Sequence, residues 1–203
     1  MKKHLVCCLA LAACAPSASP VIPPSTGDGP RPELVLIWSG HGKAERLEGG
    51  EWKRIPSFDY EFSVEQRRFG GHWESVKHMH RRHPGYDGSA GPRDQTMFFR
   101  LDYTTAPDGV RSTIQSSLGN GQGESDREFR EARLELRPEI SSFAPFNLYR
   151  ITQHYAYESA SLSETVELIK QKDGTETHWV RNHETATLFA THPFQAAPSV
   201  WSK

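Results

Sequence analysis

The sequence predicts a mainly β protein, an antiparallel meander closed or nearly closed into a barrel, with room for one or two short helices. Three observations predict this fold. Apolar side chains recur at every second residue in several segments, which is the period of a half-buried strand. Turn residues separate those segments, and helical periodicity is rare. We therefore expect a single β-rich domain over 33–203.

The expected strands follow one another at short intervals along the chain. The run at 34–38 is continuously apolar, which is typical of a strand covered on both faces. The segments 58–64, 97–103, 110–118 and 149–157 alternate between apolar and polar residues. The turn signals between strands are Gly49-Gly50, Gly70-Gly71, Asp108-Gly109, Gly119-Asn120-Gly121 and Asp173-Gly174.

Two segments carry features of both a helix and a strand. Ser125 with Glu128, and Ser161 with Glu164, have the capping-box spacing of a helix start. Segment 125–137 fits both periods about equally well. For 161–172 a strand is favoured, because the turn signal at 173–174 would close it into a hairpin with 177–180.

The amino terminus predicts export from the cytoplasm. Residues 1–4, Met-Lys-Lys-His, form a short basic stretch, and residues 5–13 form an apolar run. The length of this run suits a secretory signal peptide and is too short to span a bilayer. Prolines at 16, 20, 23, 24, 30 and 32 follow. Such a segment supports neither a strand ladder nor a core, so 14–32 is expected to be an extended tether.

Four residues at the end of the apolar run, Leu11-Ala12-Ala13-Cys14, resemble the lipobox of bacterial lipoproteins. In that family, cleavage before the cysteine leaves its sulfur carrying lipid. The resemblance implies that 1–13 is removed and that Cys14 anchors the protein to a membrane. Residue 15 is not the aspartate that marks inner-membrane retention in the family, so the resemblance implies the periplasmic face of the outer membrane.

Composition excludes several classes of function. The net charge is −1, and losing Lys2 and Lys3 makes the mature chain more acidic, so we expect no nucleic-acid partner. The three cysteines, Cys7, Cys8 and Cys14, all lie in the amino-terminal segment. The body is therefore expected to have no disulfide, no thiolate metal site and no cysteine nucleophile. No serine lies in a recognisable nucleophile motif either, and we name no catalytic residue.

The sharpest local motif is rich in histidine. If 72–80 is a strand, His72, Glu74, His78 and His80 project from one face, and same-face neighbours are about 6.6 Å apart. Imidazole and carboxylate groups suit Zn²⁺, Ni²⁺ or Cu²⁺, so these four residues are candidate ligands of a divalent transition metal. The alternative is a histidine-rich solvent-exposed face. The later residues His178, His183, Glu184 and His192 would complete the site if the last strands closed against 72–80.

The same stretch predicts a basic patch that strengthens when the imidazoles protonate. Its members are Lys77, Arg81, Arg82 and His83, together with the neighbouring histidines. Such a patch would meet phosphate or carboxylate groups of the cell envelope, and the alternative is a solvated loop.

The five tryptophans would either fill the interior of a small barrel or line an apolar ligand cavity. The expected shape is similar to that of small lipoprotein carriers and lipocalin-like barrels. We therefore expect a lipid-anchored envelope protein that is non-enzymatic and binds or carries an apolar ligand or an envelope component. The alternatives are a metal-binding or metal-dependent protein, and a structural envelope protein without a small ligand.

Overall fold

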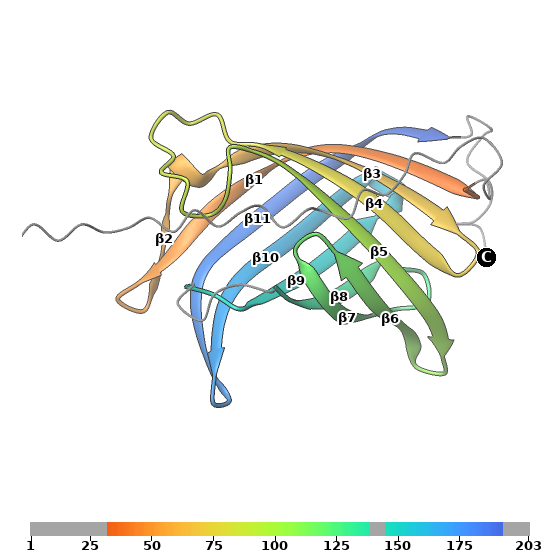
Figure 1. Ribbon diagram of the computed structural model, residues 1–203. Helices are drawn as coiled ribbons and strands as arrows, with labels where there is room; N and C mark the ends of the chain where they lie inside the picture. The colour runs from red at the N-terminus through yellow and green to blue at the C-terminus, as the bar shows by residue number, and fades with distance from the viewer. Residues whose placement is uncertain (1–31, 139–144, 193–203) are drawn as a thin grey trace, which may run out of the picture.

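The computed structural model describes residues 32–138 and 145–192. Its strands form one 11-stranded antiparallel sheet that closes on itself, because β11 pairs with β1 (Figure 1). The predicted mainly β fold and its closure into a barrel are confirmed. The strands are β1 (Leu34–Glu48), β2 (Glu51–Arg54), β3 (Tyr60–Phe69), β4 (His72–His80), β5 (Asp94–Ala106), β6 (Gly109–Ser116), β7 (Gly119–Ser125), β8 (Glu131–Arg137), β9 (Leu148–Ala156), β10 (Ser161–Lys172) and β11 (Thr175–His192).

The topology is an up-and-down meander. Every wall strand pairs with its neighbours in chain order, apart from β2, which pairs only with the end of β1 and lies outside the ring. The ring therefore runs from β1 through β3 to β11 and back to β1. Two three-residue 3₁₀-helices, η1 (Pro56–Phe58) and η2 (Tyr157–Ser159), are the helical elements of the described chain. The described residues contain no helix with the length and hydropathy that a membrane span requires.

Short turns explain much of the connectivity. The predicted pairs at 49–50, 70–71 and 173–174 are each the connection between two consecutive strands. At the last of these, Asp173 and Gly174 have φ of 51° and 77°, the left-handed values that a two-residue hairpin turn requires. The turn signal expected at 119–121 is wrong, because these residues lie within β7. A side chain at Gly121 would clash with the backbone of Glu135 on β8. The glycine at this position therefore allows β7 and β8 to approach closely.

The two ambiguous segments are both strands. Within 125–137, residues 131–137 form β8, whose Leu134 and Leu136 are buried. The capping-box residue Glu128 lies in the turn before it. Segment 161–172 is β10, as expected from its hairpin with β11.

Glycines in β1 allow the wall to close tightly. A Cβ at Gly40 would meet the backbone of Thr185 and Ala186 on β11, and a Cβ at Gly42 would meet the ring of Tyr60 on β3. The absence of a side chain at position 42 thus lets the Tyr60 ring lie directly against the wall. This contact helps to set the position of the Tyr60 hydroxyl group inside the barrel.

The two surfaces of the wall differ in chemistry. Inward-facing apolar residues form three packed groups, and Trp38 is completely buried in the first of them. Trp73 lines the interior, while Trp52 contacts the guanidinium of Arg181. Trp201, the expected signal peptide, Cys14 and the tether lie outside the described residues. The tryptophans of the described chain therefore occupy more than one environment.

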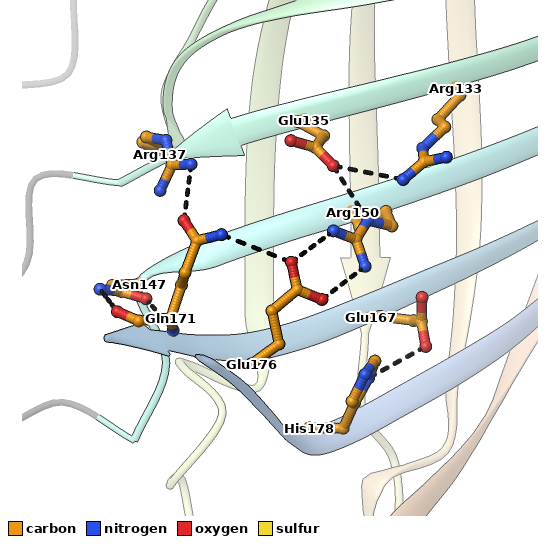
Figure 2. A network of polar contacts seen from close by, with 9 residues as sticks. All are labelled: Arg133, Glu135, Arg137, Asn147, Arg150, Glu167, Gln171, Glu176 and His178. Atoms are coloured by element: carbon orange, nitrogen blue, oxygen red, sulfur yellow. Dashed lines mark hydrogen bonds and ion pairs between the residues drawn. The ribbon is translucent and has the colours of Figure 1, made fainter. Parts of the chain in front are cut away.

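The outer surface of the wall carries rows of ion pairs (Figure 2). Arg150 on β9 donates to Glu135 on β8 at 3.0 Å and to both carboxylate oxygens of Glu176 on β11 at 2.8 and 3.0 Å. Beside this group, His178 lies 3.2 Å from Glu167 on β10. These partly exposed side chains link four strands across the outside of the barrel.

Candidate functional site

A charged cluster lies inside the barrel, where most neighbours are apolar. The Lys77 ammonium on β4 donates to both carboxylate oxygens of Glu184 on β11, at 2.6 and 2.5 Å. It also donates to Oε1 of Glu164 on β10 at 3.3 Å. All three side chains are almost completely buried. A buried charge requires a close partner of opposite charge. Lys77 is that partner for both glutamates, and the glutamates are the partners of Lys77.

Neutral side chains complete this cluster. The Tyr60 hydroxyl group donates to Oε1 of Glu184 at 2.5 Å, and the Gln153 amide donates to Oε2 of Glu164 at 2.5 Å. The Lys77 ammonium also lies 4.5 Å from the centre of the Phe62 ring, within cation–π distance. Strands β3, β4, β9, β10 and β11 each contribute to the cluster. It therefore exists only in the closed barrel.

Burial and neighbouring charges set the protonation of the cluster. Burial and the charge of Glu164 raise the pKa of Glu184 to about 7, against the lowering influence of Lys77. Burial opposes the charge of Lys77, but the two carboxylates outweigh it and raise the pKa of its ammonium group. Burial, together with Glu184, raises the pKa of Tyr60 well above its usual value. Near neutral pH, Lys77 is charged and Glu184 is close to its titration midpoint.

A second series of hydrogen-bonded side chains crosses the interior beside the cluster. The Trp38 indole donates to Oε1 of Gln66 at 2.8 Å, and the Gln66 amide donates to the Tyr155 hydroxyl group at 2.9 Å. The Trp38 and Tyr155 rings pack edge to face, with centroids 5.7 Å apart. This network satisfies the buried indole and fixes the Tyr155 ring.

The space left between these side chains is a cavity of about 180 Å³ inside the barrel. That volume is slightly larger than an engineered cavity of about 150 Å³ that accommodates benzene. The Lys77 cluster forms part of the lining. The aromatic residues around the cavity include Tyr60, Phe62, Trp73, Phe99, Tyr155 and Tyr157.

Aromatic side chains cover both ends of the barrel. At the end where β4 finishes, the 81–93 loop places Tyr86 edge to face with Phe58, 5.3 Å between centroids. At the opposite end, Phe129 contacts Tyr103 and Trp73 with centroids 5.3 and 6.3 Å apart. Phe129 lies in the turn before β8 and has a φ of 56°, which a bulky residue rarely adopts.

The predicted metal ligands share the outer face of β4, because the alternate residues Trp73, Lys77 and Met79 line the cavity. On that face the four candidates do not converge. His72 lies 3.3 Å from Glu74, whereas His78 contacts Thr96 and His80 contacts Asp94, both on β5. In the described part of the chain, no group of three or more histidine, cysteine, aspartate or glutamate side chains is arranged to hold a metal ion. The metal site stays a prediction without geometric support.

The later histidines do not join β4. His178 pairs with Glu167, and His183 lies 3.4 Å from Glu45, both on the outside of the wall. His192 ends β11 beside Val35 on β1. Of this group only Glu184 reaches β4, and it does so through the barrel interior. Closure joins β11 to β1, which places β4 across the barrel rather than beside β11.

The predicted basic patch needs correction. Lys77 and Arg81 are buried and point inward, because strand alternation places them on the opposite face from the histidines. The Arg81 guanidinium binds the carbonyl oxygens of Pro92 and Ala90. Arg82 and His83 are exposed, and Arg82 pairs with Glu61 at 2.8 Å.

Sequence reasoning missed Glu164 and Tyr60 as members of a site and assigned Lys77 to the surface. One signal was available in the alternation. Glu164 has the same parity as Leu162 and Val166, and Lys77 the same parity as Met79, so a charge occupies an apolar face in each strand. Which strands bring these charges together depends on barrel closure, and no local pattern contains that information.

The arrangement favours binding over chemistry. The raised pKa of Lys77 keeps its amine protonated, so this group is not a nucleophile. The cluster and the aromatic lining instead provide a polar anchor beside an apolar space. No known family model matches the chain, and a search of curated proteins finds no match. The structure thus defines the class as a closed antiparallel β-barrel with a charged, aromatic-lined interior.

Proposed function

We propose that this protein is a non-enzymatic carrier that holds a small, largely apolar ligand inside its barrel at the cell envelope. The observation that carries this proposal is the aromatic-lined cavity of about 180 Å³ with a buried charged cluster in its lining. Small barrels use such interiors to hold single small ligands. The outside of the wall is charged and the inside is apolar, so an apolar ligand gains most by occupying the interior.

The two ends of the barrel suggest a route for the ligand. At the Tyr86 end, Arg81 and Arg93 donate several hydrogen bonds to carbonyl groups of the 81–93 loop and hold it over the opening. At the other end, the short turn that carries Phe129 covers the interior. This turn is bonded as well, because Asp126 accepts a hydrogen bond from the Arg130 amide and the Tyr157 hydroxyl group donates to the Phe129 carbonyl oxygen. Ligand entry therefore requires one of these two bonded covers to move.

The envelope location is also part of the proposal. The lipobox-like residues Leu11-Ala12-Ala13-Cys14 and the proline-rich tether support a lipid anchor on Cys14, at the periplasmic face of an outer membrane. Mass spectrometry of the mature amino terminus tests this directly. A lipid-modified Cys14 is expected, with loss of membrane association in Cys14→Ser. An unmodified mature chain that begins elsewhere would contradict the anchor.

The carrier proposal is tested with methionine-methyl NMR of the purified chain, because Met79 and Met97 both line the cavity. Titration with toluene is expected to shift both methyl signals in a saturable way. Ser75→Leu, which adds volume to the cavity lining, is expected to weaken this binding, whereas Ser63→Leu on the exposed face is the matched control. Methyl signals that stay unchanged at high toluene concentration would favour a structural envelope protein without a small ligand.

A further inference from the structure

The charged cluster has an unequal supply of hydrogen-bond donors and acceptors. An ammonium group has three donors, and the three bonds of Lys77 to Glu184 and Glu164 account for all of them. Each carboxylate oxygen can accept about two bonds. Among the described residues, Oε2 of Glu184 and Oε1 of Glu164 have Lys77 as their one bonded partner. The carboxylates can therefore accept further hydrogen bonds, whereas the Lys77 ammonium has no donor left.

The cluster also contains more negative than positive groups. One ammonium lies between two carboxylates. The next buried cation is Arg81, which follows the end of β4 and has its guanidinium 5.7 Å from the centre of the Tyr60 ring. Carbonyl oxygens of the 81–93 loop hold that guanidinium at the end of the barrel. An added anion at the cluster would meet uncompensated negative charge, and an added cation would neutralise it.

The surrounding rings fit a cation equally well. Phe62 already presents its face to the Lys77 ammonium, and Tyr60 and Tyr155 line the cavity close to the carboxylates. Aromatic faces attract cations through their quadrupole, and desolvation strengthens this attraction. The size of the cavity limits the apolar part of the ligand to about one aromatic ring.

We infer that the ligand is a small arylalkyl amine in its ammonium form, with its nitrogen against Glu164 and Glu184 and its ring among the aromatic side chains. This inference rests on the proposed carrier function and specifies the chemistry of the same site. It disfavours a fatty acid or another carboxylate at the cluster. The amine would replace part of the solvation that the two buried carboxylates lose.

Such binding would depend on pH through Glu184. The groups that face it are Lys77 on β4, Glu164 on β10, Tyr60 on β3 and Tyr155 on β9. Because its pKa is about 7, Glu184 is mostly protonated at pH 6 and mostly ionised at pH 8. An ammonium ligand prefers the ionised form, so its affinity is expected to rise about tenfold between these two pH values.

The experiment compares three probes that share one ring and differ in charge: benzylammonium, benzyl alcohol and benzoate. Their affinities are measured on the purified full chain through the methyl signals of Met79 and Met97. The expected order is benzylammonium, then benzyl alcohol, then benzoate, with benzylammonium at least about tenfold tighter than benzoate at pH 8. The pH dependence should appear for benzylammonium and be absent for benzyl alcohol.

Two isosteric variants locate the effect. Glu164→Gln and Glu184→Gln are each expected to reduce the preference for benzylammonium over benzyl alcohol, and Glu184→Gln is also expected to remove the pH dependence. Glu167→Gln is the matched control, since it lies on the outer face of β10 and pairs with His178. Thermal unfolding of each variant tests whether the barrel remains folded. Because benzyl alcohol does not depend on the cluster charge, its binding reports an intact cavity in every variant.

The outcomes separate this inference from the carrier proposal. If benzyl alcohol binds but benzoate binds as tightly as benzylammonium or more tightly, the inference is wrong and the carrier function stands; an anion at Arg81 would be one such result. If none of the three probes, nor toluene, shifts the methyl signals, the carrier proposal itself fails.

Discussion

Lys77 and Glu184 form a two-point ion pair across the inside of the barrel, although 107 positions separate them in the chain. Both side chains are buried, so each charge depends on the other and on Glu164. The pair links β4 to β11, two strands that are not neighbours in the sheet. It is therefore a tertiary contact that reports barrel closure directly.

Removal of the buried cation is expected to destabilise the protein strongly. Lys77→Met would leave Glu164 and Glu184 without their ammonium partner, which costs about 3–5 kcal/mol when the carboxylates are ionised. At pH 5 Glu184, whose pKa is raised to about 7, can take up a proton, so the loss should be smaller than at pH 8. Urea unfolding at the two pH values measures this. Lys43→Met, an exposed position on β1, is the control and should change stability by less than about 0.5 kcal/mol. Equal losses for the two variants would contradict a buried, paired Lys77.

The stability of the unmodified protein should fall as pH rises from about 4.5 to about 7. Glu184 has a folded-state pKa near 7 and an ordinary value of 4.5, so the folded state binds its proton more tightly than the unfolded state. The resulting stabilisation is complete below pH 4.5 and is lost as pH rises through 7, a change of about 3 kcal/mol. Glu184→Gln should lack this contribution. Unfolding midpoints measured across the range for both proteins test it, and parallel curves would contradict the assigned pKa.

The close approach of Tyr60 to β1 predicts a specific glycine requirement. Gly42→Ala would place a methyl group against the Tyr60 ring and displace the hydroxyl group that donates to Glu184. We expect a loss of about 1–3 kcal/mol, typical of overpacking, measured by chemical denaturation. Gly71→Ala is the control, because a Cβ there meets no atom within 4 Å. A similar loss in both variants would show that backbone freedom, rather than ring packing, matters at position 42.

The outer ion pairs should be much less important than the inner one. Arg150→Met removes the centre of the network in Figure 2, but its side chain and those of Glu135 and Glu176 are partly exposed. We expect a loss of about 1 kcal/mol that shrinks as salt is added. Denaturation at low and high ionic strength compares it with Lys77→Met, whose loss should be nearly independent of salt. A large, salt-independent loss for Arg150→Met would overturn this distinction.

The sequence by itself determined the local structure. Strict alternation, as at Phe62 and Val64, specifies strands with one apolar face, and Asp173-Gly174 specifies a two-residue turn, because side-chain period and turn geometry are properties of neighbouring residues. The mainly β class and the succession of short antiparallel hairpins were therefore predictable. The role of Gly121 was not, since a glycine in a turn and a glycine under a neighbouring strand look alike in one chain.

The tertiary structure alone decided the site. The sequence placed His72, Glu74, His78 and His80 on one face of a strand but could not show that this face is the outside of the wall. It also contained Lys77, Glu164 and Glu184 without any sign that they meet. Their meeting depends on the number of strands in the ring and on the strand order, which bring β4, β10 and β11 around one interior. Strand number and order arise from pairing along the whole wall, and no single segment encodes them.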